Sequence, residues 1–359
     1  MVEREVIRRI IIEGQEFVNE ISLTERPFFF EQKGNYVFVG IRQAGKSYLL
    51  YQRIQQLLRE EHNINEIVYI NFDDERLRQM TADDLDLILQ AYHSLFDLRP
   101  LLFFDEIQNI EGWEHFARRL ANQKYNIYIT GSNAKMLSRE IATTLGGRFW
   151  NKDVYPYSFA EYLNARDIIL SKNWMYGKQA AEVSKAFNDY FLYGGFPELT
   201  DVIAKRVWLN DIYSKIFFSD LIVRNKVRNE EALGLLVRRL AENVKQPVSY
   251  TRLANLISSI GIKISKATVI EFIRYLKESC LIFPIENYAA KFAERNSNMK
   301  HYFIDNGLLS IFLLDGNTSL LENIVAIHLY KRYGAQLYFY NQNIEVDFVI
   351  PEAKTANQA

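Results

Sequence analysis

The stretch from Tyr36 to Leu50, YVFVGIRQAGKSYLL, constrains this chain more than any other part of its sequence. A run of strand-forming residues ends at Gly40, and a helix-like pattern begins near Lys46. The residues from Gly40 to Ser47 fit the pattern GxxxxGK[ST] at every position. Glycines in such a loop let several backbone N–H groups converge on phosphate groups, and the helix that follows adds the positive end of its dipole. The pattern predicts a phosphate-binding loop; the alternative is an ordinary strand-to-helix turn.

Each side chain of such a loop has an expected task. The Lys46 ammonium would reach the β- and γ-phosphates of ATP, and the Ser47 hydroxyl would ligate Mg²⁺. The residues that we expect to contact the nucleotide are Gly40, Arg42, Gln43, Ala44, Gly45, Lys46, Ser47 and Tyr48.

A second motif, LLFFDEIQ, runs from Leu101 to Gln108. Its four apolar residues predict a buried strand, and Asp105 and Glu106 emerge at the carboxyl end, beside the phosphate loop. We expect Asp105 to hold Mg²⁺ and Glu106 to polarise the attacking water as a general base. A solvated strand end is the alternative, but the pair of carboxylates after a matched phosphate loop indicates an ATPase rather than a nucleotide binder.

Two further candidates follow in the chain. The strand IYITGSN ends in polar residues, of which we expect Asn133 to contact the γ-phosphate or the water, with Ser132 as second choice or as a helix cap. Arg148, after two glycines in TTLGGRFW, is a candidate for stabilising transition-state charge, in its own subunit or from a neighbouring one. A surface or salt-bridge role is the alternative for Arg148.

Short apolar runs alternate with helical patterns between residues 35 and 154, which predicts an α/β fold with a doubly wound parallel sheet. A helical lead-in is expected at 1–34 and a helical region at 155–243. A winged-helix-like domain is expected at 244–298 and a small α/β module at 299–359. With a net charge of −1, a single cysteine and no apolar run of membrane-spanning length, the chain is expected to be cytoplasmic, with no membrane partner.

Several motifs together resemble a prokaryotic family of AAA-like P-loop ATPases fused to a C-terminal domain of unknown function. They are GIRQAGKS, YINFDD, FFDEIQ, YITGSNAKMLS, LGGRF, VYPYSFAEYL, YFLYGGFPE and YFIDNGLL. The resemblance covers nearly the whole chain and implies ATP binding and hydrolysis, with Asp105, Glu106 and Asn133 in the roles above. The hallmark YGGFPE, from Tyr193 to Glu198, is interpreted as a turn that joins helices.

The winged-helix pattern carries Lys266, Arg274 and Lys277 on the outer face of its second helix. Nine Lys and Arg residues stand against four Asp and Glu residues between positions 245 and 300, which favours weak phosphate contacts with DNA. Contact with a protein partner is the equal alternative, because that helix also carries Glu271 and Glu278 and lacks Asn or Gln for base reading. A homo-oligomer is also considered.

The tail places Glu322 on a helix and Asp347 on a strand, as restriction-endonuclease-like folds begin their metal site. Such a site also needs (D/E)xK on the returning strand. Glu352-Ala353-Lys354 matches (D/E)xK, but it follows Asp347 too closely and is expected at the hairpin turn rather than on the returning strand. The predicted metal site therefore lacks its lysine. We expect the tail to be a structural module that resembles a nuclease but has lost its activity, rather than an active nuclease.

The leading hypothesis is therefore a Mg²⁺-dependent ATPase that acts as a molecular switch for a DNA or protein partner. A nucleotide-stabilised DNA- or protein-binding regulator with negligible turnover is the first alternative. An ATP-dependent nuclease is the second.

Overall fold

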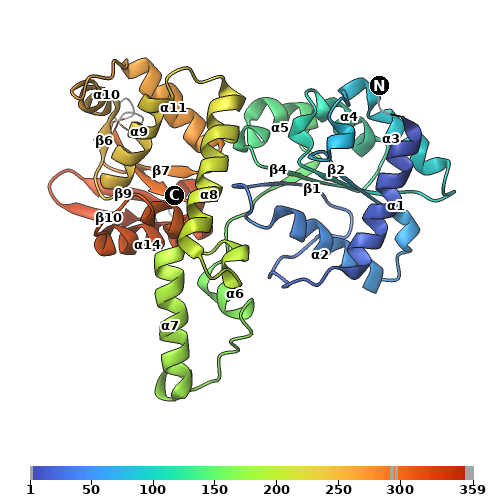
Figure 1. The fold of residues 1–359 in the computed structure, drawn as a ribbon, viewed down its shortest axis with the longest axis horizontal. Coiled ribbons are helices and arrows are strands. Elements are labelled where there is room, and N and C mark those ends of the chain that lie inside the picture. The colour runs from blue at the N-terminus through green and yellow to red at the C-terminus, as the bar shows by residue number, and fades with distance from the viewer. Residues whose placement is uncertain (1–2, 292–294, 296–297, 352–359) are drawn as a thin grey trace, which may run out of the picture. The chain divides into compact units, whose positions relative to one another are not determined.

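The computed structural model of the chain describes residues 3–291, 295 and 298–351. The chain divides into two compact units, residues 1–154 and 155–359, and each unit is described by itself. Figure 1 shows the elements of both units. Within the described residues, no helix is long and apolar enough to cross a membrane.

The first unit is built on a parallel sheet with the strand order β2-β3-β4-β1-β5. Its strands are β1 (Asn35–Val39), β2 (Ile67–Asn71), β3 (Leu101–Asp105), β4 (Ile127–Gly131) and β5 (Phe149–Asp153). Because Val39 is in register with Gly131 and Phe104 with Ile129, the carboxyl ends of β1, β3 and β4 meet at one edge of the sheet. The predicted α/β class with a parallel sheet is confirmed.

The edge strand β5 was not predicted from the sequence. Its residues, FWNKD, are largely exposed, with Trp150 at 55% of its full exposure, so they show neither an apolar run nor a clean alternation. The strand forms because it pairs along its whole length with buried β1. Tertiary pairing, rather than local pattern, therefore decides this element.

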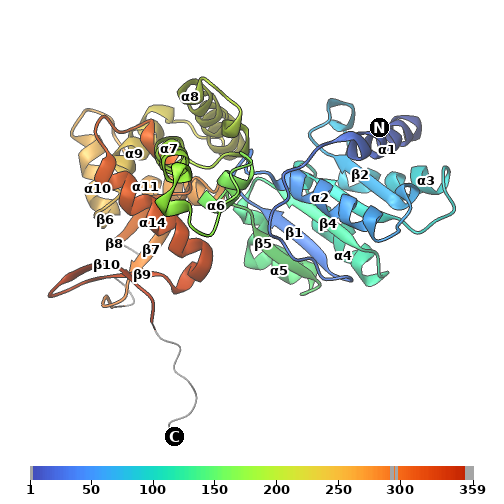
Figure 2. The same cartoon turned by 90° about the horizontal axis from the view of Figure 1, so that it is seen from below.

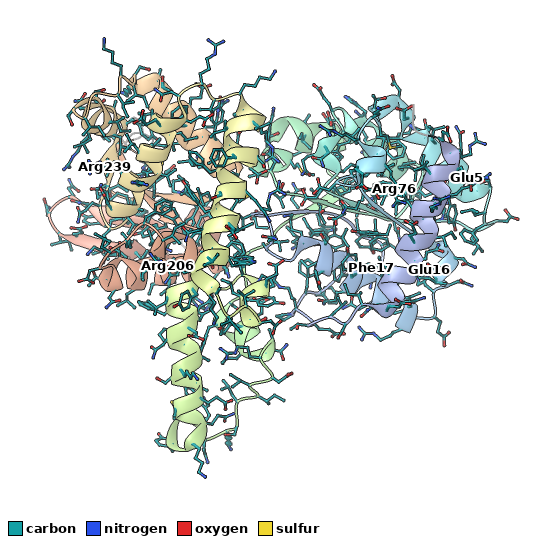
Figure 3. The ribbon with its side chains drawn as sticks, in the orientation of Figure 1. Glu5, Glu16, Phe17, Arg76, Arg206 and Arg239 are labelled. Atoms are coloured by element: carbon teal, nitrogen blue, oxygen red, sulfur yellow. The ribbon has the colours of Figure 1, made fainter. Side chains whose placement is uncertain are left out.

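Helices cover both faces of this sheet, with α2 on one face and α4 on the other (Figure 1). Their bounds are α1 (Arg4–Glu20), α2 (Lys46–Arg59), α3 (Asp86–His93), α4 (Trp113–Asn122) and α5 (Arg139–Leu145). Helix α1 packs against β2, where the Gln15 amide donates to the Ile67 carbonyl at 2.8 Å. The exposed residues Glu5 and Glu16 lie on its outer side (Figure 3). The lead-in helix thus belongs to the core of the first unit.

The second unit combines helices with a sheet of strand order β10-β9-β7-β8-β6 (Figure 2). Its strands are β6 (Val248–Ser249), β7 (Ile282–Asn287), β8 (Asn298–Phe303), β9 (Tyr338–Asn341) and β10 (Glu345–Val349). Its helices are α6 (Phe159–Asn164), α7 (Lys178–Tyr193), α8 (Lys205–Lys215), α9 (Glu230–Glu242), α10 (Tyr250–Ser258), α11 (Lys266–Glu278), α13 (Asn306–Ser310) and α14 (Asn317–Tyr333). A π-helical stretch, Ile216–Val223, continues α8.

The hallmark YGGFPE forms the turn between α7 and a short 3₁₀ helix at Pro197–Thr200. Gly194 ends α7 with a φ of 77°, a backbone conformation that residues other than glycine rarely adopt. The N–H group of the next residue, Gly195, donates to the Asp305 carboxylate just before α13. This turn therefore ties two distant hallmark motifs of the second unit together.

Candidate functional site

The loop after β1 has the backbone shape that its glycines predict. A Cβ atom on Gly40 would lie 1.9 Å from the Val154 carbonyl oxygen, so only glycine fits there. Gln43 and Gly45 both have positive φ angles, 61° and 89°, which curl the loop before α2 begins at Lys46. The loop ends at a helix N-terminus, which is a favourable place for phosphate.

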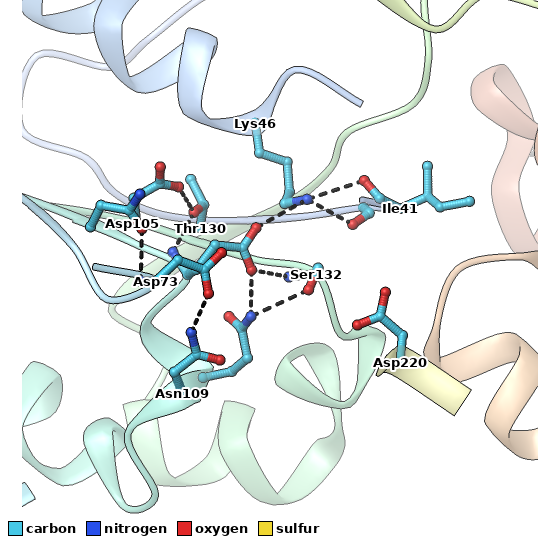
Figure 4. A network of polar contacts seen from close by, with 12 residues as sticks. Ile41, Lys46, Asp73, Asp105, Asn109, Thr130, Ser132 and Asp220 are labelled. Atoms are coloured by element: carbon cyan, nitrogen blue, oxygen red, sulfur yellow. Dashed lines mark hydrogen bonds and ion pairs between the residues drawn. The ribbon is translucent and has the colours of Figure 1, made fainter. Parts of the chain in front are cut away.

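Lys46 lies at the centre of this loop and is almost fully buried. Its ammonium donates to the carbonyl oxygens of Gly40 and Ile41, each at 3.1 Å, and lies 3.4 Å from a Glu106 carboxylate oxygen, Oε1 (Figure 4). The three acceptors hold the charge where the loop curls around it. A buried ammonium facing the loop has the chemistry to pair with phosphate oxygens.

Asp105 ends β3 and is buried among hydroxyl groups. The Tyr69 hydroxyl donates to its Oδ2 atom at 2.8 Å, and the hydroxyls of Thr130 and Ser47 also hydrogen-bond to this carboxylate. Burial and the neighbouring Glu106 charge raise the pKa of Asp105, and the three hydroxyls partly offset the rise. A carboxylate and a serine hydroxyl in contact are hard oxygen donors of the kind that Mg²⁺ prefers, so Asp105 and Ser47 fit this ion.

Glu106 follows in a left-handed backbone conformation, with φ of 52° and ψ of 40°. Its own N–H group donates to the Thr130 hydroxyl oxygen at 2.9 Å. Burial alone would raise the pKa of Glu106, but the Lys46 charge and hydrogen bonds from Gln108 and Ser132 outweigh it and lower the pKa. The carboxylate is thus kept ionised, which a general base requires.

The other expected loop residues surround this centre. The Ala44 carbonyl accepts a hydrogen bond from the Arg26 guanidinium at 3.1 Å, and Arg42 is one of the charges that lower the pKa of Glu106. Tyr48 points from α2 with about half of its surface exposed, at 51%, and its ring contacts Tyr51. These placements agree with a loop whose inner side carries the polar chemistry.

At the end of β4, Asn133 and Ser132 make different contacts, and the predicted nucleotide contact of Asn133 stays a prediction. The Asn133 side chain accepts from the backbone N–H of Lys135 at 2.8 Å and caps the 3₁₀ helix Ala134–Leu137. Its neighbour Ser132 instead donates its backbone N–H to Glu106 Oε2 at 3.1 Å. Ser132, the second choice from the sequence, therefore lies in contact with the predicted base, and Asn133 caps a helix.

Thr130, Tyr69 and Gln108 contact the two carboxylates but received no role from the sequence. Thr130 had a visible signal, because it is a hydroxyl residue at the end of a buried strand. Tyr69 and Gln108 had none, since an aromatic residue inside an apolar strand and a glutamine after a motif are both common. The sheet order brings Tyr69 of β2 beside Asp105 of β3.

Arg148 lies just before β5, where Phe149 is in register with Asn35 at the start of β1. The phosphate loop follows the carboxyl end of β1, whereas Arg148 lies beside its amino end. Arg148 and its own loop are therefore at opposite ends of the strands. Its exposed guanidinium donates to the Gly146 carbonyl at 3.2 Å. The role of Arg148 in stabilising transition-state charge, in its own subunit or from a neighbouring one, stays a prediction.

In the second unit, Glu322 and Asp347 both form ion pairs with a lysine that the sequence did not indicate. The Lys300 ammonium of β8 lies 3.3 Å from Glu322, 2.7 Å from Asp347 and 3.5 Å from Glu345. The Lys300 side chain is fully buried, and the Tyr302 hydroxyl also donates to Glu322 at 2.7 Å. Across the described part of the chain, no group of three His, Cys, Asp or Glu side chains is arranged to hold a metal ion. Glu352-Ala353-Lys354 lies outside the described residues.

The basic face predicted on α11 is partly neutralised. Arg274 lies 3.7 Å from Glu271 and 4.0 Å from Glu278 on the same helix. Lys266 and Lys277 are exposed. The positive charge available on this face is therefore smaller than the sequence count suggests.

Protein-family comparison matches residues 32–163 to an AAA domain and residues 184–319 to a domain of unknown function (DUF8612). The first match contains the phosphate loop, both carboxylates and Arg148. It supports ATP binding by the first unit.

Two curated relatives are similar over most of their length. The uncharacterized protein MJ1544 of Methanocaldococcus jannaschii is 31% identical over 98% of this chain and 80% of its own length. An uncharacterized protein of Haemophilus influenzae is 30% identical over 88% of this chain and 79% of its own. Among solved structures, the Walker-type ATPase PABY2304 of Pyrococcus abyssi matches 87% of this chain and 96% of its own, at 14% identity and a TM-score of 0.48. A likeness this loose supports no conclusion about activity.

Proposed function

We propose that this chain, which belongs to the same family as MJ1544 and carries an AAA domain, is a Mg²⁺-dependent ATPase that acts as a molecular switch. The observation that carries the proposal is the position of Lys46 between the phosphate loop and Glu106, 3.4 Å from Oε1. A phosphate-binding cation, a metal-binding pair and an ionised base then share one edge of the sheet. A simple strand-to-helix turn would need none of these groups.

The residues divide the work of hydrolysis as follows. The loop N–H groups and Lys46 bind the phosphates, so the ammonium leaves Glu106 Oε1 when ATP is bound. Ser47 and Asp105 would hold Mg²⁺, which neutralises charge on the phosphate groups when bound. Glu106 accepts a proton from water; the water oxygen bonds to the γ-phosphorus, the bond to the bridging oxygen breaks, and ADP and phosphate leave. Glu106 is therefore the residue on which turnover depends most.

The partner of the switch is proposed to be DNA, contacted through the winged-helix-like region expected at 244–298. The support is the element order α9-β6-α10-α11-β7-β8, with both β6 and β7 pairing antiparallel to β8, as a winged helix requires. The exposed side chains of Lys266 and Lys277 on α11 would contact phosphates. A protein partner remains the alternative, because Glu271 and Glu278 offset Arg274.

The test is ATP binding and turnover with Mg²⁺, with and without duplex DNA. Lys46→Ala should lose ATP affinity, whereas Glu106→Gln should bind ATP and lose turnover by at least about a hundredfold. Lys135→Ala serves as a control, because Lys135 is an exposed lysine of the same unit. An effect of DNA on the wild-type rate would support the switch and its partner class.

Two outcomes would replace this proposal. ATP binding without turnover under every condition would favour a nucleotide-stabilised regulator. Absence of ATP binding by the wild type would make the loop only a turn.

A further inference from the structure

Gln108 stands two residues after the proposed base and has no role so far. Its Nε2 group donates to Glu106 Oε2 and, at 3.3 Å, to the Ser132 hydroxyl oxygen. The Ser132 backbone N–H donates to the same Oε2 atom at 3.1 Å. One oxygen of Glu106 is thus held by two donors that belong to the protein framework.

The other oxygen of Glu106 has a different kind of partner. Oε1 faces the Lys46 ammonium at 3.4 Å, and Lys46 is the group that ATP phosphates would attract. Binding of ATP would draw Lys46 away from Oε1, whereas both donors to Oε2, the Gln108 amide and the Ser132 N–H group, belong to the protein. The two oxygens of the carboxylate are not equivalent.

The Gln108 amide has a defined direction. Its NH₂ end faces Glu106, because an ionised carboxylate only accepts hydrogen bonds. The carbonyl end lies close against Gly131, where a Cβ atom would lie 2.4 Å from Gln108 Oε1. Among the described residues, the buried Gln108 Oε1 atom has no hydrogen-bond partner. Buried acceptors of this kind are uncommon and call for an explanation.

We propose that Gln108 is a positioning residue for catalysis, which clamps Oε2 of Glu106 and leaves Oε1 as the atom that accepts the proton from water. This inference rests on the proposed ATPase function and deepens it. The clamp holds the carboxylate in one orientation after Lys46 has moved to the phosphates.

The test compares Gln108→Met, which keeps the length and removes the donor, with Gln108→Glu, which places a second carboxylate beside the first. Gln123→Met is the matched control, since Gln123 is exposed at the far end of α4. In both Gln108 variants kcat should fall between tenfold and about a hundredfold, while KM for ATP stays within about threefold.

A second readout does not need turnover. In ¹³C-glutamate-labelled protein at one fixed pH, the chemical shift of the Glu106 carboxyl signal, assigned by its loss in Glu106→Gln, should differ in both Gln108 variants from that in wild type and Gln123→Met, because the donor to Oε2 is lost. Wild-type protein without ATPase activity would defeat the proposed function, but this chemical shift would still report on the hydrogen bond from Gln108. An unchanged chemical shift and an unchanged kcat in either folded Gln108 variant would overturn the inference, as would equal losses in Gln123→Met.

Discussion

The Asp305 carboxylate accepts a hydrogen bond from the Gly195 backbone N–H at 2.8 Å, across 110 residues of chain. Its other oxygen accepts from the N–H groups of Gly307 and Leu308, at 2.8 and 3.3 Å, and so caps α13. Asp305 is buried, and a Cβ atom on Gly194 would lie 2.0 Å from its Oδ1 atom. The YGGFPE turn and the YFIDNGLL segment are therefore two halves of one structural contact.

We expect Gly194→Ala to lower the free energy of unfolding by more than about 2 kcal/mol, because the new methyl group meets Asp305 and the positive φ is strained. Urea denaturation followed by circular dichroism measures the change. Gly177→Ala is the control, since its φ is −124° and a Cβ atom there meets nothing within 4 Å. Equal losses in both variants would contradict the contact.

Stability should also depend on the protonation of Asp305. Burial raises its pKa to about 6, and the three backbone hydrogen bonds only partly offset this. A group whose pKa is raised on folding stabilises the protein below its unfolded pKa and loses that contribution as the pH rises through the folded pKa. The free energy of unfolding should therefore fall between about pH 4 and pH 6, by up to about 3 kcal/mol. Asp305→Asn should remove this slope; a slope that persists in the variant would assign it to another group.

Tyr69→Phe should raise the Mg²⁺ concentration needed for half-maximal turnover by about tenfold. The Tyr69 hydroxyl donates to Asp105, and without it the carboxylate is less firmly oriented and its pKa rises further. Tyr92→Phe is the matched control, because Tyr92 is a buried tyrosine of the same unit whose hydroxyl donates to the Asn65 carbonyl instead. Titration of ATPase activity with Mg²⁺ separates the two. The same Mg²⁺ dependence in all three proteins would remove Asp105 from the metal site.

Arg148→Ala should bind ATP normally but hydrolyse it slowly, and mixing should restore activity. A partner carrying Glu106→Gln has a dead site but an intact Arg148, so it can supply the arginine to the neighbouring site. Turnover in the mixture should exceed that of either variant alone, because Arg148 lies at the sheet edge opposite its own loop. Each variant incubated with itself is the control. Full activity of Arg148→Ala alone would return the residue to a surface role.

Lys300→Met should destabilise the second unit by about 1–3 kcal/mol, since it leaves the largely buried Glu322 without its cation, while solvent screens the half-exposed Glu345 and Asp347. Lys291→Met, at an exposed lysine of the same unit, should be nearly neutral. Urea denaturation measures both. We interpret the cluster as structural; metal-dependent cleavage of DNA by the wild type that disappears in Asp347→Asn would instead make it a nuclease site.

The pattern of apolar residues along the chain predicted much of the sheet of the first unit. The apolar runs that end at Val39, Asp105 and Gly131 became β1, β3 and β4, because a strand covered on both faces must be apolar throughout. The edge strand β5 could not be found in this way, since its exposed side chains carry no such pattern. The sequence did not indicate the lysine between Glu322 and Asp347 for a similar reason. Lys300 lies on another strand, whereas the (D/E)xK pattern finds a lysine only close to the acidic residue in the sequence.

The sequence by itself determined the phosphate loop, because a GxxxxGK[ST] loop depends on backbone freedom at two glycines and on two side chains next to them. It also determined that two carboxylates follow a buried strand. Only the tertiary structure decided which groups meet those carboxylates. Strand order brings Tyr69 and Thr130 to Asp105, and the Gln108 amide lies against Gly131 and donates to Glu106. The residues that make these contacts lie close together in space, but their positions in the sequence do not predict this closeness.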